Sequence, residues 1–200
     1  MARQSSRSLW TAKLTGKPVT QAQAEATLAA ASFARRTPFV GTILGVDPSL
    51  RGTGLALVRF EAQDTKKLLG SRTLKLPAKA SQAECLGEIA RAVSSILDSE
   101  HVDCVALEQT IYVQNFQTAQ IMGQARGAAI GVAAMRGIAI FDYAPLRIKQ
   151  AVVGYGRASK EQVAAMVRQH CGLVADLPLD EADAAAVAIC HALTGARSDT

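Results

Sequence analysis

The spacing of apolar residues along the chain predicts alternating strands and helices. Short apolar runs bounded by Gly, Pro or charged residues are typical of strands, and apolar residues at every third or fourth position are typical of helices. Strands are predicted at residues 42–47, 53–60, 67–76, 102–107 and 138–143. Helices are predicted at residues 81–97, 119–136, 159–170 and 179–193. Three consecutive strands followed by alternating helices and strands predict a mixed sheet covered by helices.

The first 40 residues differ in character from the rest of the chain. They contain no strand-like run, and their one Ala-rich stretch, residues 21–34, is followed by Pro38. Residues 1–40 hold six basic side chains and one acidic side chain, so their net charge of +5 equals that of the whole chain. We interpret residues 1–40 as a flexible basic arm that binds nucleic acid or an acidic surface, with a solvated tail as the alternative. Residues 41–200 are the predicted folded domain.

Composition narrows the class of protein. Hydrophobic residues make up 49% of the 200 residues and charged residues 20%, as in soluble globular proteins. The longest stretch of small or apolar residues, 127–135, is too short to cross a bilayer, and no secretory signal is expected. The four cysteines are Cys85, Cys104, Cys171 and Cys190. Because they lie far apart among apolar neighbours, we expect free, mostly buried thiols in a reducing compartment and no zinc site.

Two acidic residues end predicted strands. Asp47 follows the apolar run 43–46, and Glu108 follows the run 105–107. If these two strands lie side by side and parallel, the two carboxylates converge at one end of the sheet. Burying unpaired carboxylates is costly, so such a pair favours a bound cation. The alternative is that each acid simply faces water at the end of its strand.

A further acidic pair opens the predicted helix 179–193. Asp180 and Asp183 are three residues apart and therefore share a helix face. Alternatively, Asp180 caps the helix and Asp183 belongs to a capping box. Together with Asp47 and Glu108, the pair makes a set of four carboxylates that suits magnesium, which prefers oxygen ligands. Two such ions, about 3.5–4 Å apart, can hold the attacking and leaving oxygens of a phosphodiester.

Five segments together resemble the motifs of RuvC-type Holliday-junction resolvases. The segments are residues 43–48 with Arg51, Thr53 and Gly54; 106–109; 123–128; 149–154 with Lys160; and 180–191. Their shared order and spacing over residues 41–191 make the resemblance specific. It implies the ribonuclease H-like fold, an α/β architecture with a mixed five-stranded sheet flanked by helices.

The resemblance also implies an activity and the residues that perform it. The implied activity is that of a homodimeric endonuclease, which resolves four-way DNA junctions by paired nicks in recombination and repair. Magnesium, with two ions per site and Mn²⁺ as a substitute, would activate the attacking water. The implied metal-binding and catalytic acids are Asp47, Glu108, Asp180 and Asp183, and Lys160 is expected to support catalysis. The side chains expected to contact DNA are Lys149, Lys160 and Arg126.

Partners and compartment follow from the same resemblance. Four-way junction DNA and a second copy of the chain are the expected partners, with a branch-migration helicase complex as a further one and no membrane. The expected compartment is the bacterial cytoplasm. An organelle is the alternative, because residues 1–40 contain Arg and Ser and few acids, as transit peptides do.

The sequence departs from the family pattern in three places. Ser49 stands where the family usually has Gly, so we predict that this turn needs no glycine-only conformation. Ile111 stands where the family often has an aromatic residue that disturbs base stacking, and Tyr112 and Phe116 are the other candidates for this wedge. The 40-residue arm has no counterpart in the usual start of the family.

The predicted helix 119–136 carries a stripe of small residues. Gly123, Gly127 and Gly131 recur every four residues, which permits a second helix to approach closely. We predict a homodimer through this helix, since a two-fold junction favours a two-fold protein. The alternative is that the stripe packs on the sheet of its own chain.

Other functions compete with the resolvase. A junction-binding scaffold without catalysis and another nuclease of the same fold are the nearest alternatives. A phosphotransferase of the actin-like type is disfavoured, because such proteins usually need two such domains and no Gly-x-x-x-x-Gly-Lys-Ser/Thr phosphate loop is present. His170 and His191 are expected on helix surfaces rather than as ligands.

Overall fold

The computed structural model describes residues 38–110 and 115–195. Most of the predicted arm, residues 1–37, lies outside the described residues, and so do Ile111 and Tyr112. The expectations for the arm and for the base-unstacking wedge therefore stay predictions. No helix among the described residues has the length and apolar character needed to cross a membrane.

One five-stranded sheet forms the centre of the domain. Its strands are β1 (Gly41–Asp47), β2 (Gly52–Phe60), β3 (Lys66–Lys75), β4 (Cys104–Glu108) and β5 (Ala139–Tyr143), in the order β3-β2-β1-β4-β5. The first three strands form an antiparallel meander, and β4 and β5 continue the sheet parallel to β1. This arrangement confirms the predicted mixed five-stranded sheet.

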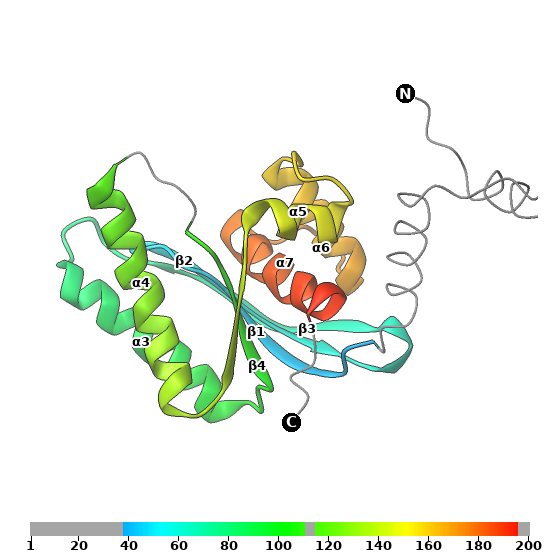
Figure 1. The fold of residues 1–200 in the computed structure, drawn as a ribbon, viewed down its shortest axis with the longest axis horizontal. Coiled ribbons are helices and arrows are strands. Elements are labelled where there is room, and N and C mark those ends of the chain that lie inside the picture. The colour runs from blue at the N-terminus through cyan, green and yellow to red at the C-terminus, as the bar shows by residue number, and fades with distance from the viewer. Residues whose placement is uncertain (1–37, 111–114, 196–200) are drawn as a thin grey trace, which may run out of the picture. The chain divides into compact units, whose positions relative to one another are not determined.

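Helices cover both faces of the sheet (Figure 1). Helices α3 (Gln82–Ser99) and α4 (Phe116–Met135) lie on one face. Helices α5 (Pro145–Val153), α6 (Lys160–Cys171) and α7 (Leu179–Thr194) lie on the other. The strand-alternating pattern explains the two cores, since in β1 Ile43 belongs to the α7 side, whereas Leu44 and Val46 belong to the α3 and α4 side.

Helix α5 is missing from the sequence prediction, which expected no element between β5 and α6. It starts with Pro145 at a first-turn position and ends at Gly154, whose φ of 95° lies in the left-handed region. Only Ile148 and Val152, four residues apart, are buried. Nine residues with one such pair gave too weak a helical period to detect.

Helix α7 lies unusually close to the sheet, because two glycines face it. A Cβ at Gly45 would overlap the carbonyl oxygen of Ala184, and a Cβ at Gly54 would overlap that of Asp180. The helix also presents an almost wholly buried surface of small and branched residues from Ala182 to His191. These contacts place the first turn of α7 beside the end of β1.

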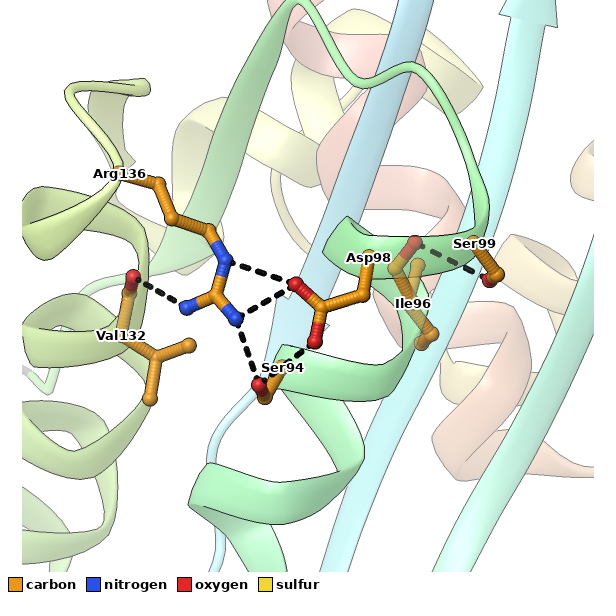
Figure 2. Close-up of polar contacts among 6 residues, drawn as sticks. All are labelled: Ser94, Ile96, Asp98, Ser99, Val132 and Arg136. Carbon is orange, nitrogen blue, oxygen red and sulfur yellow. Dashed lines mark hydrogen bonds and ion pairs between the residues drawn. The ribbon is translucent and has the colours of Figure 1, made fainter.

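The pair α3–α4 is tied together at one end by Arg136, which follows α4 (Figure 2). Its Nη2 donates to Asp98 Oδ1 at 2.7 Å and to Ser94 Oγ at 2.6 Å, both on α3. Exposed ion pairs of this kind contribute little stability, so the contact mainly fixes the relative position of the two helices.

Several residue-level predictions can be compared with the structure. Cys85, Cys104 and Cys190 are buried, Cys171 is partly buried, and all four thiols are free, as predicted. The prediction that His191 lies on a helix surface is wrong: it is 3% exposed, and its Nδ1 lies 2.7 Å from the hydroxyl of Tyr143. Burial lowers the pKa of His191 to about 4, so it is neutral at physiological pH.

Candidate active site

Two of the predicted acids meet at the end of adjacent parallel strands. Val46 of β1 pairs with Leu107 of β4, so Asp47 and Glu108 come next at the same edge of the sheet. The first two turns of α7 reach this edge because of the close approach at Gly54. They bring Asp183 to the same place.

A pocket of about 200 Å³ collects these side chains. Its lining residues are Asp47, Glu108, Pro145, Ile148, Lys149, Lys160, Val163 and Asp183. Three of the four predicted acids and both predicted lysines therefore share one cavity, whose apolar wall comes from α5 and α6. Carboxylates and ammonium groups in a partly buried cavity are the ingredients of a metal-assisted phosphoryl site.

Asp180, the fourth acid, does not line this pocket. Its carboxylate lies beside the turn between β1 and β2, where a Cβ on Gly52 would stand 3.7 Å from Asp180 Oδ2. The capping alternative for Asp180 and Asp183 is wrong, because Pro178 is the N-cap and no side chain caps the helix. Asp180 is nevertheless close enough to raise the pKa of Asp47.

The acids in the pocket repel one another. Burial, followed by the charge of Asp183, raises the pKa of Asp47 to about 6, although Lys160 acts in the opposite direction. Burial, followed by the charges of Asp47 and Asp183, raises the pKa of Glu108 to about 7, and Lys160 and Lys149 only partly offset this. The negative charge of the pocket thus exceeds what its two lysines compensate.

Lys160 is held firmly at the pocket. It is the first residue of α6, after a capping box formed by Ser159 and Gln162. Its Nζ donates to Asp183 Oδ2 at 2.6 Å, and this bond is the main reason that the pKa of Lys160 is raised. The Tyr155 hydroxyl donates to Gln162 Oε1 at 2.6 Å and so supports the same turn.

The donor atoms suit magnesium better than their present spacing does. The pocket offers only carboxylate oxygens as anionic ligands, the type that magnesium prefers. Within the described ranges, however, no three carboxylate, imidazole or thiol side chains stand close enough to hold one metal ion. One oxygen of Asp183 is bonded to Lys160 instead. The residue types therefore fit the metal, and rotation of these side chains would complete its site.

A second cavity, of about 300 Å³, continues from the first and was not predicted. It shares Asp47, Glu108 and Pro145 with the first cavity, and its other lining residues are Pro48, Gln109, Thr110 and Met122. Thr110 Oγ1 is buried and makes no hydrogen bond among the described residues. The position of Thr110 two residues after Glu108 was the only signal in the sequence.

The remaining predicted DNA contacts lie at different distances from the chemistry. Lys149 lines the pocket, whereas Arg126 lines neither cavity and pairs with Asp142 at 2.5 Å. Phe116 is 82% exposed at the start of α4. The turn after Asp47 contains Ser49 without a left-handed φ, as predicted.

The raised pKa of Asp47 predicts an effect on stability. Since its folded pKa of about 6 lies above the ordinary value of 3.8, its ionised form weakens the folded state above pH 6, and this penalty disappears as the pH falls below 4. Without metal, Asp47→Asn should be more stable than the wild type by about 1–3 kcal/mol at pH 8. Urea denaturation at pH 8 and pH 4 measures this, and an equal difference at both pH values would contradict it.

Comparisons with known proteins agree with this geometry. The family model for crossover junction endodeoxyribonuclease RuvC matches residues 43–191. Similar relatives are the RuvC proteins of Alkaliphilus oremlandii, 41% identical over 76% of this chain and 93% of the relative, and of Halorhodospira halophila, 43% identical over 75% and 89%.

Solved structures give the same result. A structure described as T. thermophilus RuvC in complex with Holliday junction substrate matches with a TM-score of 0.72 and 32% identity, over 76% of this chain and 93% of that one. The yeast mitochondrial Holliday junction resolvase Ydc2 matches with a TM-score of 0.60 at 10% identity, over 91% and 89%, and supports the fold alone. The chain therefore belongs to the RuvC family of crossover junction endodeoxyribonucleases.

Proposed function

We propose that this protein resolves four-way DNA junctions by paired nicks, in recombination and repair, with water activated by magnesium. The pocket that unites Asp47, Glu108 and Asp183 with Lys160 is the observation that carries the proposal. Membership of the family supports the substrate, because similar chains are crossover junction endodeoxyribonucleases and one was solved with a Holliday junction.

Each residue of the pocket has a proposed role. Asp47, Glu108 and Asp183 would hold magnesium, or manganese in its place, and Asp180 would join them from the adjacent turn of α7. The bound ions would activate water and stabilise the leaving oxygen. Lys160 places a positive charge where the scissile phosphate gains negative charge.

DNA binding would use groups around the pocket. Lys149 and Lys160 present ammonium groups at its wall, where they can contact phosphates near the cut. Arg126 would exchange its ion pair with Asp142 for a phosphate. The wedge that separates bases at the junction is assigned to Ile111 or Tyr112, which lie outside the described residues.

We propose that the active form is a homodimer through α4. Gly123, Gly127 and Gly131 are exposed, and no atom lies within 4 Å of a Cβ built at any of them, whereas Ala125 and Ala129 face the core. The alternative, in which the glycine stripe packs on its own sheet, is therefore wrong. A stripe of small residues on a free helix face permits close packing against the same stripe of a second copy.

A charged side chain in the stripe tests the dimer. Gly127→Glu has open space in the single chain but would place like charges at the two-fold contact, so light scattering at micromolar concentration should show a shift from dimer to monomer. The control is Ser95→Glu on the exposed side of α3, which should stay dimeric. A wild-type protein that is monomeric even with junction DNA would contradict the proposal.

The relatives named above come from bacteria, which supports the bacterial cytoplasm as the proposed compartment. A branch-migration helicase complex stays a partner expected from the family resemblance.

The nicking reaction itself tests the proposed function. With magnesium, the protein should cut a labelled four-way junction in paired strands and leave a linear duplex of the same sequence intact; with a chelator, it should bind the junction without cutting. Binding without cutting in magnesium would favour the inactive scaffold. Equal cutting of the duplex would favour another nuclease of this fold.

A further inference from the structure

We infer that Glu181 is a positioning residue that fixes the first turn of α7 and thereby tunes the metal affinity of its two neighbouring acids, Asp180 and Asp183. The inference rests on the proposed metal role of those acids. Glu181 was part of the acidic segment that opens the helix in the sequence, but no function had been assigned to it.

Two hydroxyl groups on β3 hold the carboxylate of Glu181. Ser71 Oγ donates to Glu181 Oε2 at 2.6 Å, and Thr73 Oγ1 donates to Glu181 Oε1 at 3.4 Å. Ser71 and Thr73 are two residues apart on one strand, so their side chains leave the same face of the sheet. Both oxygens of Glu181 are thus engaged away from the pocket, which separates it in role from the acids on either side.

This contact compensates for the missing cap of α7. The helix begins after Pro178 with no capping side chain, so its first turn depends on contacts with the sheet. One of these is the approach of the Asp180 carbonyl to Gly54, and Gly54 pairs with Thr73 in the sheet. The carboxylate of Glu181 and the backbone of Asp180 are therefore fixed against neighbouring positions of β2 and β3.

Fixing this turn matters because metal binding needs accurate ligand placement. Residues follow one another by about 100° around a helix, so a small rotation of the first turn moves Asp180 and Asp183 relative to Asp47. Magnesium requires nearly ideal octahedral geometry and tolerates such displacement poorly. Groups that orient metal ligands typically change metal affinity by about 10–100-fold when removed.

The other end of α7 supplies a matched control. There, His191 is hydrogen-bonded to Tyr143 on β5, and this contact also ties the helix to the sheet. Eight residues of helix separate His191 from Asp183, which corresponds to about 12 Å. Tyr143→Phe should therefore lower stability and leave metal affinity as in the wild type.

The experiment measures metal binding by the full chain without DNA, through the rise in melting temperature with Mn²⁺ or Mg²⁺, and compares it with the metal dependence of nicking. Glu181→Ala should raise the half-saturating metal concentration about tenfold in both measurements. Ser71→Ala should raise it in the same direction. Glu181→Gln should stay near the wild type, because its amide oxygen still accepts a hydroxyl bond.

The outcomes separate the clamp from its alternatives. If the metal midpoint of Glu181→Ala matches that of the wild type, the inference is wrong. If Glu181→Gln is as weak as Glu181→Ala while Ser71→Ala is normal, the charge of Glu181 acts rather than its position, which also overturns the inference. A wild type that shows no metal-dependent stabilisation removes the proposed metal role, and the inference falls with it.

Discussion

Replacing Asp47 with asparagine, or Glu108 with glutamine, is expected to slow magnesium-dependent nicking of a four-way junction by at least about a hundredfold. Each change keeps the size of the side chain but removes a negative charge from a pocket where three carboxylates meet. The attacking water and the leaving oxygen both gain negative charge, so weaker metal binding raises the barrier directly. Asp183→Asn should behave similarly, and Asp180→Asn should show a smaller loss, because Asp180 lies outside the pocket.

Junction binding should survive these changes, since phosphate contacts and junction shape provide most of the affinity. Binding without metal should even tighten, because fewer like charges face the phosphates. Asp176→Asn is a suitable control: this acid is exposed, pairs with Arg168 and lies outside both cavities, so nicking should be normal. Nearly normal nicking by Asp47→Asn or Glu108→Gln would contradict the assignment. Loss of binding together with a changed circular dichroism spectrum would show that the acids are structural.

Gly54→Ala is expected to destabilise the fold by about 1–3 kcal/mol, the usual cost of forcing extra atoms into a packed core. The added Cβ would overlap the carbonyl oxygen of Asp180, and that atom belongs to the backbone of a helix that cannot move alone. To relieve the overlap, α7 must lift from β2, which would also displace Asp180 and Asp183 from Asp47. Nicking should therefore fall by more than the loss of folded protein explains.

The neighbouring strand provides the control for this prediction. A Cβ at Gly70 of β3 would meet no atom within 4 Å, so Gly70→Ala should be neutral or slightly stabilising. Urea denaturation of both variants measures the difference. If Gly54→Ala unfolds at the same urea concentration as Gly70→Ala, the close approach of α7 does not limit the structure as described.

The sequence predicted the sheet and the acids at its edge because both depend on local patterns. A strand that ends in a carboxylate, as β1 does at Asp47 and β4 at Glu108, is visible without knowledge of the fold. Their convergence then needs only the parallel pairing of β1 with β4, which the order of elements favours. The family resemblance added Lys149 and Lys160, which spacing alone would have assigned to solvent.

Features that depend on long-range packing were not visible in the sequence. The pattern that suggested a cap at Asp180 is local, but the helix begins one residue earlier because α7 must meet the sheet at Gly54. His191 was assigned to a surface because its type is polar, whereas its burial depends on a bond to Tyr143, 48 residues away. The clamp between Glu181 and Ser71 joins residues 110 positions apart, and no local pattern indicates it.

Anomalous diffraction from crystals of the protein soaked in Mn²⁺ would test the central claim most directly. The account predicts manganese peaks in the pocket bounded by Asp47, Glu108 and Asp183, with the Asp183 carboxylate released from Lys160 and within about 2.0–2.3 Å of a metal ion. The peaks should be absent or much weaker in Asp47→Asn crystals soaked in the same way. Manganese bound only elsewhere, in a protein that nicks junctions in the same solution, would contradict the claim that these acids hold the catalytic metal.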